Sequence, residues 1–162
     1  MNKTRPALVL RRMRWWDIDV VHGVEERAFP KTAWSTETFW SELAGVPNTR
    51  HYVVAASGER VIGYAGLMAV GLEADVQTLA VATDYQRQGV GAQLLDALID
   101  EAKRRECSRL TLEVAAASEP AKSLYLRRGF EVISRRSGYY GPGADALIMR
   151  LRLRSFPEGS AP

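Results

Sequence analysis

Residues 86–92 read Gln86-Arg87-Gln88-Gly89-Val90-Gly91-Ala92 and lie between a predicted strand, 76–81, and a strongly amphipathic predicted helix, 89–104. In the first turn of a helix the backbone N–H groups have no partner within the helix. Two glycines, Gly89 and Gly91, let a bulky anion approach these donors, and the helix dipole favours negative charge there. The stretch therefore predicts a pyrophosphate-binding loop.

The residues after the loop narrow the kind of nucleotide. A Walker A loop ends in Gly-Lys-Ser/Thr, which does not follow Gly91, and a Rossmann fingerprint needs a third glycine where Leu94 stands. The nucleotides that bind a Walker A loop and the dinucleotides that bind a Rossmann fold are therefore disfavoured, and coenzyme A becomes the leading candidate.

Hydrophobic periodicity predicts a mixed α/β order for the rest of the chain. Pro30 ends a first helix that begins near Asp17, and Ser35 is a suitable N-cap for a second one. A hairpin at Ser57-Gly58-Glu59 joins two β-rich runs. The expected strands are 8–13, 51–56, 60–70, 76–81, 109–114, 130–140 and 146–153, and the later helices are 89–104 and 119–128.

Composition limits the class of protein. With 162 residues the chain has room for one compact domain, which we expect over 1–154, followed by a flexible tail at 155–162. A lone cysteine, Cys107, and the lack of a Cys/His cluster predict a reducing, cytoplasmic compartment and no metal. A net charge of only +3 argues against direct nucleic-acid binding, and the N-terminal apolar run is too short for a membrane segment.

The loop motif resembles that of a known family. Gln86-x-x-Gly89-x-Gly91, preceded by Asp84-Tyr85, is similar to the acetyl-CoA loop of the GNAT acetyltransferases. The predicted order of elements is similar over nearly the whole chain. This resemblance implies the α/β (α+β) GNAT fold, in which helices flank a mixed, mostly antiparallel central sheet, with acetyl-CoA as cosubstrate. The alternative, a glycine-opened helix whose loop binds nothing, is disfavoured by the arginine and glutamine flanks.

Further motifs resemble the RimI-type N-α-acetyltransferases, which acetylate the N-terminus of a ribosomal protein. The most discriminating are Leu112-Glu113-Val114 and Arg136-x-x-Tyr139-Tyr140. The others are Ala28-Phe29-Pro30 with Trp34-Ser35, Leu79-Ala80-Val81, Leu124-Tyr125-x-x-x-Gly129-Phe130 and Asp145-Ala146-x-x-Met149. The resemblance implies acetylation of an N-terminal Ala of a small-subunit ribosomal protein, and we favour a monomer.

The chain departs from this family at two places. The family often has Arg-x-Ser-Asn after Leu-Glu-Val, whereas Ala115-Ala116-Ala117-Ser118 stands here, so Ser118 replaces an Asn contact to the coenzyme or that contact is lost. Three extra residues, Lys31-Thr32-Ala33, separate Pro30 from Trp34 in a loop that helps to shape the peptide site of relatives. The resemblance therefore constrains the reaction more than the substrate.

Amide formation from a thioester needs a neutral amine and a proton for the departing thiolate. An α-amino group titrates near ~7.7–8.0 and a lysine near ~10.4, so neutralising a lysine costs about 3.4 kcal/mol more. A single carboxylate base is therefore better matched to N-termini. Glu113 is the candidate base, because strand alternation places it opposite Leu110, Leu112 and Val114. The alternative is a strand glutamate paired with an arginine.

The resemblance assigns further roles. Tyr125, on the helix after this strand, is the candidate acid, the alternative being a half-buried tyrosine under the sheet. Backbone groups of Leu79, Ala80 and Val81 are similar to those that hold the pantetheine arm and polarise the thioester carbonyl. Arg87 is a candidate contact to the 3′-phosphate. Phe29, Trp34, Tyr139 and Tyr140 either bind the substrate or belong to the core and hairpin.

Two other functions remain open at this point. Within the enzyme class, the chain is a GNAT enzyme acting on small-molecule amines or protein lysines. From a different class, it is a non-catalytic acyl-CoA-binding module that has little need for both Glu113 and Tyr125. Turnover measured with and without peptide separates these alternatives.

Overall fold

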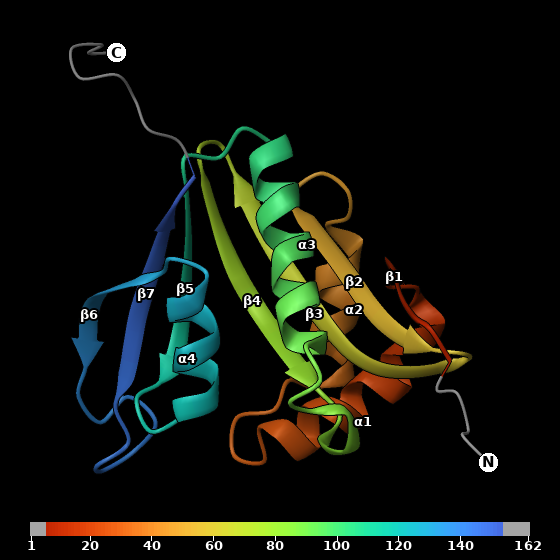
Figure 1. Cartoon of the computed structure of the whole chain (residues 1–162), viewed down its shortest axis with the longest axis horizontal. Coiled ribbons are helices and arrows are strands. Elements are labelled where there is room, and N and C mark those ends of the chain that lie inside the picture. The colour runs from red at the N-terminus through yellow and green to blue at the C-terminus, as the bar shows by residue number, and fades with distance from the viewer. Residues whose placement is uncertain (1–5, 154–162) are drawn as a thin grey trace. The chain divides into compact units, whose positions relative to one another are not determined.

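The computed structural model describes residues 6–153, which contain seven strands and four α-helices (Figure 1). No described helix combines the length and apolar character needed to cross a membrane. The tail expected at 155–162 lies outside the described residues. The elements are β1 (Leu8–Arg12), α1 (Ile18–Ala28), α2 (Thr36–Ala44), β2 (Arg50–Ser57), β3 (Arg60–Val70), β4 (Glu73–Val81), α3 (Val90–Arg104), β5 (Arg109–Ala115), α4 (Glu119–Arg127), β6 (Glu131–Arg136) and β7 (Ala146–Arg152), with short 3-10 turns at Trp15–Asp17 and Thr83–Tyr85.

The strands form a seven-stranded sheet in the order β1-β2-β3-β4-β5-β7-β6. β4 and β5 pair in parallel, whereas β1–β2, β2–β3, β5–β7 and β6–β7 are antiparallel. The expectation of a mixed, mostly antiparallel sheet with helices is therefore confirmed. The chain forms two compact units, one from the residues up to Met68 with Gln77–Asp100, the other from Ala69–Val76 with the residues from Glu101 onward.

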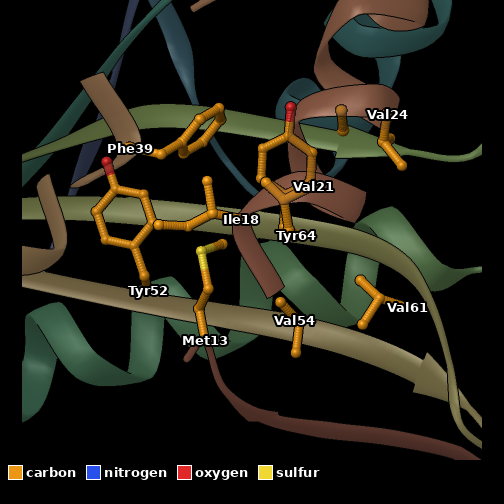
Figure 2. Packing of buried hydrophobic residues seen from close by; sticks show 10 residues of the cluster. Met13, Ile18, Val21, Val24, Phe39, Tyr52, Val54, Val61 and Tyr64 are labelled. Atoms are coloured by element: carbon orange, nitrogen blue, oxygen red, sulfur yellow. The ribbon is translucent and has the colours of Figure 1, made fainter. Parts of the chain in front are cut away.

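In the first unit, helices α1 and α2 bury their apolar faces against β2, β3 and the end of β4. Phe39 of α2 meets Tyr64 of β3 edge-to-face, with ring centroids 5.8 Å apart. Figure 2 shows the two rings in a cluster that draws side chains from the helices and from the strands. Its members are Met13, Ile18, Val21, Val24, Phe39, Tyr52, Val54, Val61, Tyr64 and Ala80.

Helix α3 covers the opposite face of this part of the sheet. Successive strand residues point to opposite faces, so Gly63 lies on the face away from Tyr64. A Cβ atom on Gly63 would lie 3.1 Å from the Leu94 side chain of α3 and 3.1 Å from the Ala80 carbonyl. The absence of a side chain at Gly63 thus allows α3 to approach the sheet closely, and this fixes the helix that follows the predicted anion loop.

In the second unit, two strand boundaries differ from expectation. β4 begins at Glu73, three residues earlier than the expected start at 76, because Glu73 pairs with Arg109 of β5 in register and through an ion pair of 2.9 Å. β6 ends at Arg136 rather than at 140. The chain turns there because Gly138 has a φ of 63° and Asp145 accepts a hydrogen bond of 2.8 Å from the Gly138 N–H.

Candidate active site

The predicted anion loop is an exposed turn between β4 and α3. Gly89 has a φ of 82°, the left-handed region that favours glycine, and nothing lies within 4 Å of the position that a Cβ atom would take. The first backbone bond of α3 joins the Gln93 N–H to the Gly89 carbonyl at 3.1 Å. The N–H groups of Val90, Gly91 and Ala92 precede that bond and have no acceptor within α3.

Two glutamines hold this loop in place. The side-chain amide of Gln86 donates a 3.1 Å hydrogen bond to the Val81 carbonyl at the end of β4. The side-chain amide of Gln88 donates to the Asp84 carbonyl at 3.2 Å. Arg87 between them is exposed, with a φ of 61°. The glutamines that flank the glycines therefore shape the turn, while Arg87 projects a cation from it.

This loop fits the diphosphate of an acylated coenzyme. The open space at Gly89, the N–H groups at the start of α3 and the exposed Arg87 guanidinium supply the room, the donors and the charge that a diphosphate needs. A side chain on Gly89 would fill the same space. The structure joins the loop to the predicted pantetheine strand, Leu79 to Val81, through Gln86.

Phe29 and Trp34, the predicted peptide-site aromatics of the first unit, are partly buried against the hydrophobic core. Phe29 ends α1, with its N–H bonded to the Glu25 carbonyl at 2.8 Å. The Trp34 ring lies 5.5 Å from that of Phe39. Because Phe29 and Trp34 are only partly buried, packing against the core does not prevent them from contacting a substrate. Their substrate-binding role stays a prediction.

In the second unit, Glu113 is on the outer face of β5. Its side chain is 32% exposed, whereas Leu110, Leu112 and Val114 are buried, as the alternation predicts. Arg136 of β6 lies beside it, with 3.9 Å between the Arg136 Nη1 and Glu113 Oε1 atoms. Both partners are partly exposed, and a solvated pair at this distance is weak. Pairing with Arg136 therefore does not prevent Glu113 from acting as a base, because the carboxylate keeps access to solvent.

Tyr139 and Tyr140 lie in the turn after β6, with their rings edge-to-face and centroids 5.0 Å apart. The Arg136 guanidinium lies 5.4 Å from the Tyr139 ring centroid. Partial burial and the negative charge of Glu113 raise the pKa of Tyr140. The structure thus brings both tyrosines to the neighbourhood of Glu113.

Asp145 fixes this tyrosine turn. It accepts hydrogen bonds from the Gly138 N–H and from the Arg135 guanidinium, each 2.8 Å long. These two bonds lower the pKa of Asp145. Sequence reasoning noted Asp145 only within a motif and gave it no role.

Tyr125 is buried, with 7% of its surface exposed, and its ring lies 5.7 Å from that of Phe130. Burial raises the pKa of Tyr125 to about 12, so the phenol is protonated at neutral pH. Ser118 occupies the N-cap of α4, but its hydroxyl makes no capping hydrogen bond. Tyr125 therefore carries a proton, and the role of each residue stays a prediction.

Sequence reasoning missed Glu25 of α1. The residues Ile18, Val21 and Glu25 are three and four apart, so Glu25 lies in the apolar stripe of the helix. A charged residue in such a stripe was the available signal. The structure buries Glu25 within hydrogen-bonding distance of strands β3 and β4 and of the segment between α1 and α2.

The chain is similar to known proteins over most of its length. Residues 14–130 match the model of the "Acetyltransferase (GNAT) family". A putative ribosomal protein bS18-alanine N-acetyltransferase of Bacillus subtilis is 34% identical over 91% of this chain and 95% of its own. The ribosomal protein bS18-alanine N-acetyltransferase of Escherichia coli K12 is 36% identical over 83% of this chain and 90% of its own. The crystal structure of the ribosomal-protein-S18-alanine N-acetyltransferase from Escherichia coli superposes with a TM-score of 0.84 at 30% identity, covering 96% of this chain and 99% of that one.

Proposed function

The chain belongs to the acetyltransferase (GNAT) family, and from this premise we propose that it transfers acetyl from acetyl-CoA to the α-amino group of a protein N-terminus. The relatives named for ribosomal protein bS18 match most of both chains, so the N-terminal Ala of a small-subunit ribosomal protein is the proposed substrate. Such a substrate places the reaction in the cytoplasm. The observation that carries the proposal is the exposed turn at the start of α3, in which Gly89 leaves open space beside backbone N–H donors.

The proposed reaction needs one base, one acid and backbone donors. Glu113 takes a proton from the substrate ammonium, and the amine nitrogen then attacks the thioester carbonyl. The backbone of Leu79, Ala80 and Val81 supports the thioester. When the tetrahedral intermediate collapses, the C–S bond breaks, Tyr125 gives its proton to the departing thiolate, and the phenolate takes the remaining proton from the new amide nitrogen. Gln86 to Ala92 with Ser118 hold the coenzyme, and Phe29, Trp34, Tyr139 and Tyr140 bind the peptide.

Tyr125→Phe is expected to lower the turnover number about tenfold, because the variant has no phenolic proton to give to the thiolate. The pKa of about 12 keeps the acid protonated at every lower pH, so turnover of the parent protein should not fall through loss of this proton below about pH 11. Thiol release measured from pH 6 to 10 tests both statements. Tyr52→Phe, an equally buried tyrosine on β2, is the control and should retain turnover.

A peptide panel tests the proposed substrate. Peptides are varied at the first two residues, and mass spectrometry locates the acetyl group after incubation with acetyl-CoA. We expect rapid modification of the α-amino group of an Ala-led peptide and at least about 10²-fold slower modification of an internal lysine in the same peptide with a blocked N-terminus. The lysine should react more slowly, since about 3.4 kcal/mol more is needed to neutralise it.

Other outcomes identify the alternatives. Faster acetylation of polyamines or aminoglycosides than of any peptide would make the chain a small-amine acetyltransferase. Acetylation of internal lysines at the rate of N-termini would make it a lysine acetyltransferase. Acetyl-CoA binding without thiol release in the presence of any of these amines would indicate a non-catalytic module.

A further inference from the structure

Glu25 is a buried carboxylate of the first unit to which the proposed reaction gives no role. It lies on α1 with 2% of its surface exposed. Among the described residues, no lysine or arginine forms an ion pair with it. Burying a carboxylate is costly unless hydrogen bonds compensate. A leucine at this position would avoid that cost, so Glu25 must do something that an apolar side chain does not.

Three donors from three different segments converge on the Glu25 carboxylate. The Tyr64 hydroxyl of β3 and the Thr78 hydroxyl of β4 both donate to Oε2, the latter at 3.1 Å. Figure 2 shows the hydroxyl of Tyr64 turned toward the helix that carries Val21 and Val24. The Trp34 N–H, in the segment between α1 and α2, donates to Oε1 at 3.5 Å.

Two of these segments belong to the proposed site. Trp34 lies in the segment that follows Phe29 and is a proposed peptide contact. Thr78 immediately precedes Leu79, the first residue of the proposed thioester strand. One carboxylate therefore links the peptide segment with the strand that supports the acyl group, over sequence separations of 9 and 53 residues.

The ionisation of Glu25 is consistent with a fixed, inaccessible group. Burial raises the pKa of its carboxyl group, while the bonds from Tyr64, Thr78 and Trp34 and the charge of His22 act in the opposite direction. A carboxyl group with so little exposed surface does not meet a substrate amine. Its influence on the reaction must therefore pass through the residues that it holds.

We propose that Glu25 is a positioning residue that fixes the Trp34 segment against β4 and thereby sets the affinity for the peptide. This inference rests on the proposed function, because it assigns Trp34 to the peptide site. It requires a hydrogen bond from the Trp34 N–H to one side-chain atom of residue 25 and hydrogen bonds between the other and the two hydroxyls, and it requires no proton transfer from Glu25.

Glu25→Leu is the main test, because leucine keeps the apolar volume and removes both acceptors. We expect the KM for an Ala-led peptide to rise at least tenfold, while kcat changes less than threefold and the Kd for acetyl-CoA is unchanged. Glu25→Gln should restore most of the peptide KM, since its amide oxygen can accept from the Trp34 N–H while the two hydroxyls accept from its NH₂ group. Glu26→Leu, an exposed neighbour on α1, is the control and should match the parent protein.

The same variants have a readout that needs no substrate. Hydrogen exchange at the Trp34 amide should be at least tenfold faster in Glu25→Leu and near the parent rate in Glu25→Gln. If the parent protein acetylates no peptide, the proposed function fails. The exchange rates still test whether Glu25 holds the Trp34 segment in place.

Three results would overturn the proposal. One is an unchanged Trp34 exchange rate in Glu25→Leu. Another is a loss of kcat of tenfold or more in both Glu25→Gln and Glu25→Leu, which would indicate proton transfer by Glu25. The third applies if Glu25→Leu does not fold. In that case Thr78→Val removes one donor to Glu25 with little change of side-chain shape, and we expect the peptide KM to rise about threefold. A peptide KM within 1.5-fold of the parent value would contradict the positioning role of Glu25.

Discussion

Glu113→Gln should lower the turnover number for an Ala-led peptide at least about tenfold at neutral pH, where only about a tenth of the α-amino groups are already neutral. The amide has nearly the size of the carboxylate but cannot take a proton from the substrate ammonium. The change also removes the weak ion pair with Arg136, whose 3.9 Å separation and exposure make its contribution to stability small. The loss should therefore appear in kcat, with an unchanged melting temperature.

The pH profile distinguishes a lost base from a general loss of activity. The variant must wait for an amine that has already lost its proton, and an α-amino group does so around pH ~7.7–8.0. Its activity should rise with pH through that range, so its pH profile lies at higher pH than that of the parent protein. Initial rates from pH 6 to 10, measured as acetylated peptide by mass spectrometry, give the two profiles.

Glu73→Gln is the matched control for this experiment. Glu73 is also a strand glutamate beside an arginine, at 2.9 Å from Arg109, and it has no proposed part in the reaction. Its variant should keep the turnover and the pH profile of the parent protein. Unchanged activity of Glu113→Gln at neutral pH would show that Glu113 is not the base.

Gly89→Val is expected to weaken acetyl-CoA binding by about 10²-fold. A β-branched residue strongly disfavours the observed φ of 82°, and its side chain would enter the open space that we assign to the diphosphate. The loss of one or two backbone hydrogen bonds to a charged group costs about 1.5–3 kcal/mol each. Titration calorimetry with acetyl-CoA measures the change directly.

Gly71→Val separates backbone strain from the loss of a binding site. Gly71, between β3 and β4, has a φ of 60° and also has nothing within 4 Å of a Cβ position. Both variants should therefore lose similar stability on thermal unfolding. Only Gly89→Val should lose affinity, and equal acetyl-CoA affinities in the two variants would refute the assignment of the loop.

The parts of the fold that follow local rules were predictable from the sequence. Glycines and a clear apolar stripe located the loop and α3, and alternation placed Glu113 on the outer face of β5. The start of β4 was missed because Glu73 and Asp75 make its first residues polar, and only pairing with β5 reveals them as a strand. The end of β6 depends on Asp145, seven residues beyond the Gly138 N–H that it binds.

The parts of the site that depend on distant contacts were not predictable. Glu25 accepts hydrogen bonds from Tyr64 and Thr78, which lie 39 and 53 residues away in the sequence. No local sequence pattern therefore predicts this group of hydrogen-bonded residues. The sequence offers only a glutamate in an apolar stripe, which is equally compatible with a side chain that reaches the surface. By contrast, the resemblance of short motifs was enough to indicate the family, because those motifs describe backbone turns and single strands.

The hydrogen bond from the Gln86 side chain to the Val81 carbonyl gives the connection between β4 and α3 a fixed length. One end of this connection carries the proposed thioester contacts and the other carries the proposed diphosphate contacts. An insertion among residues 82–85 would separate two anchors whose spacing has to match a cofactor of constant dimensions. Change in substrate preference is therefore expected in the segments around Trp34 and Tyr139, which carry the proposed peptide contacts, and not in this connection.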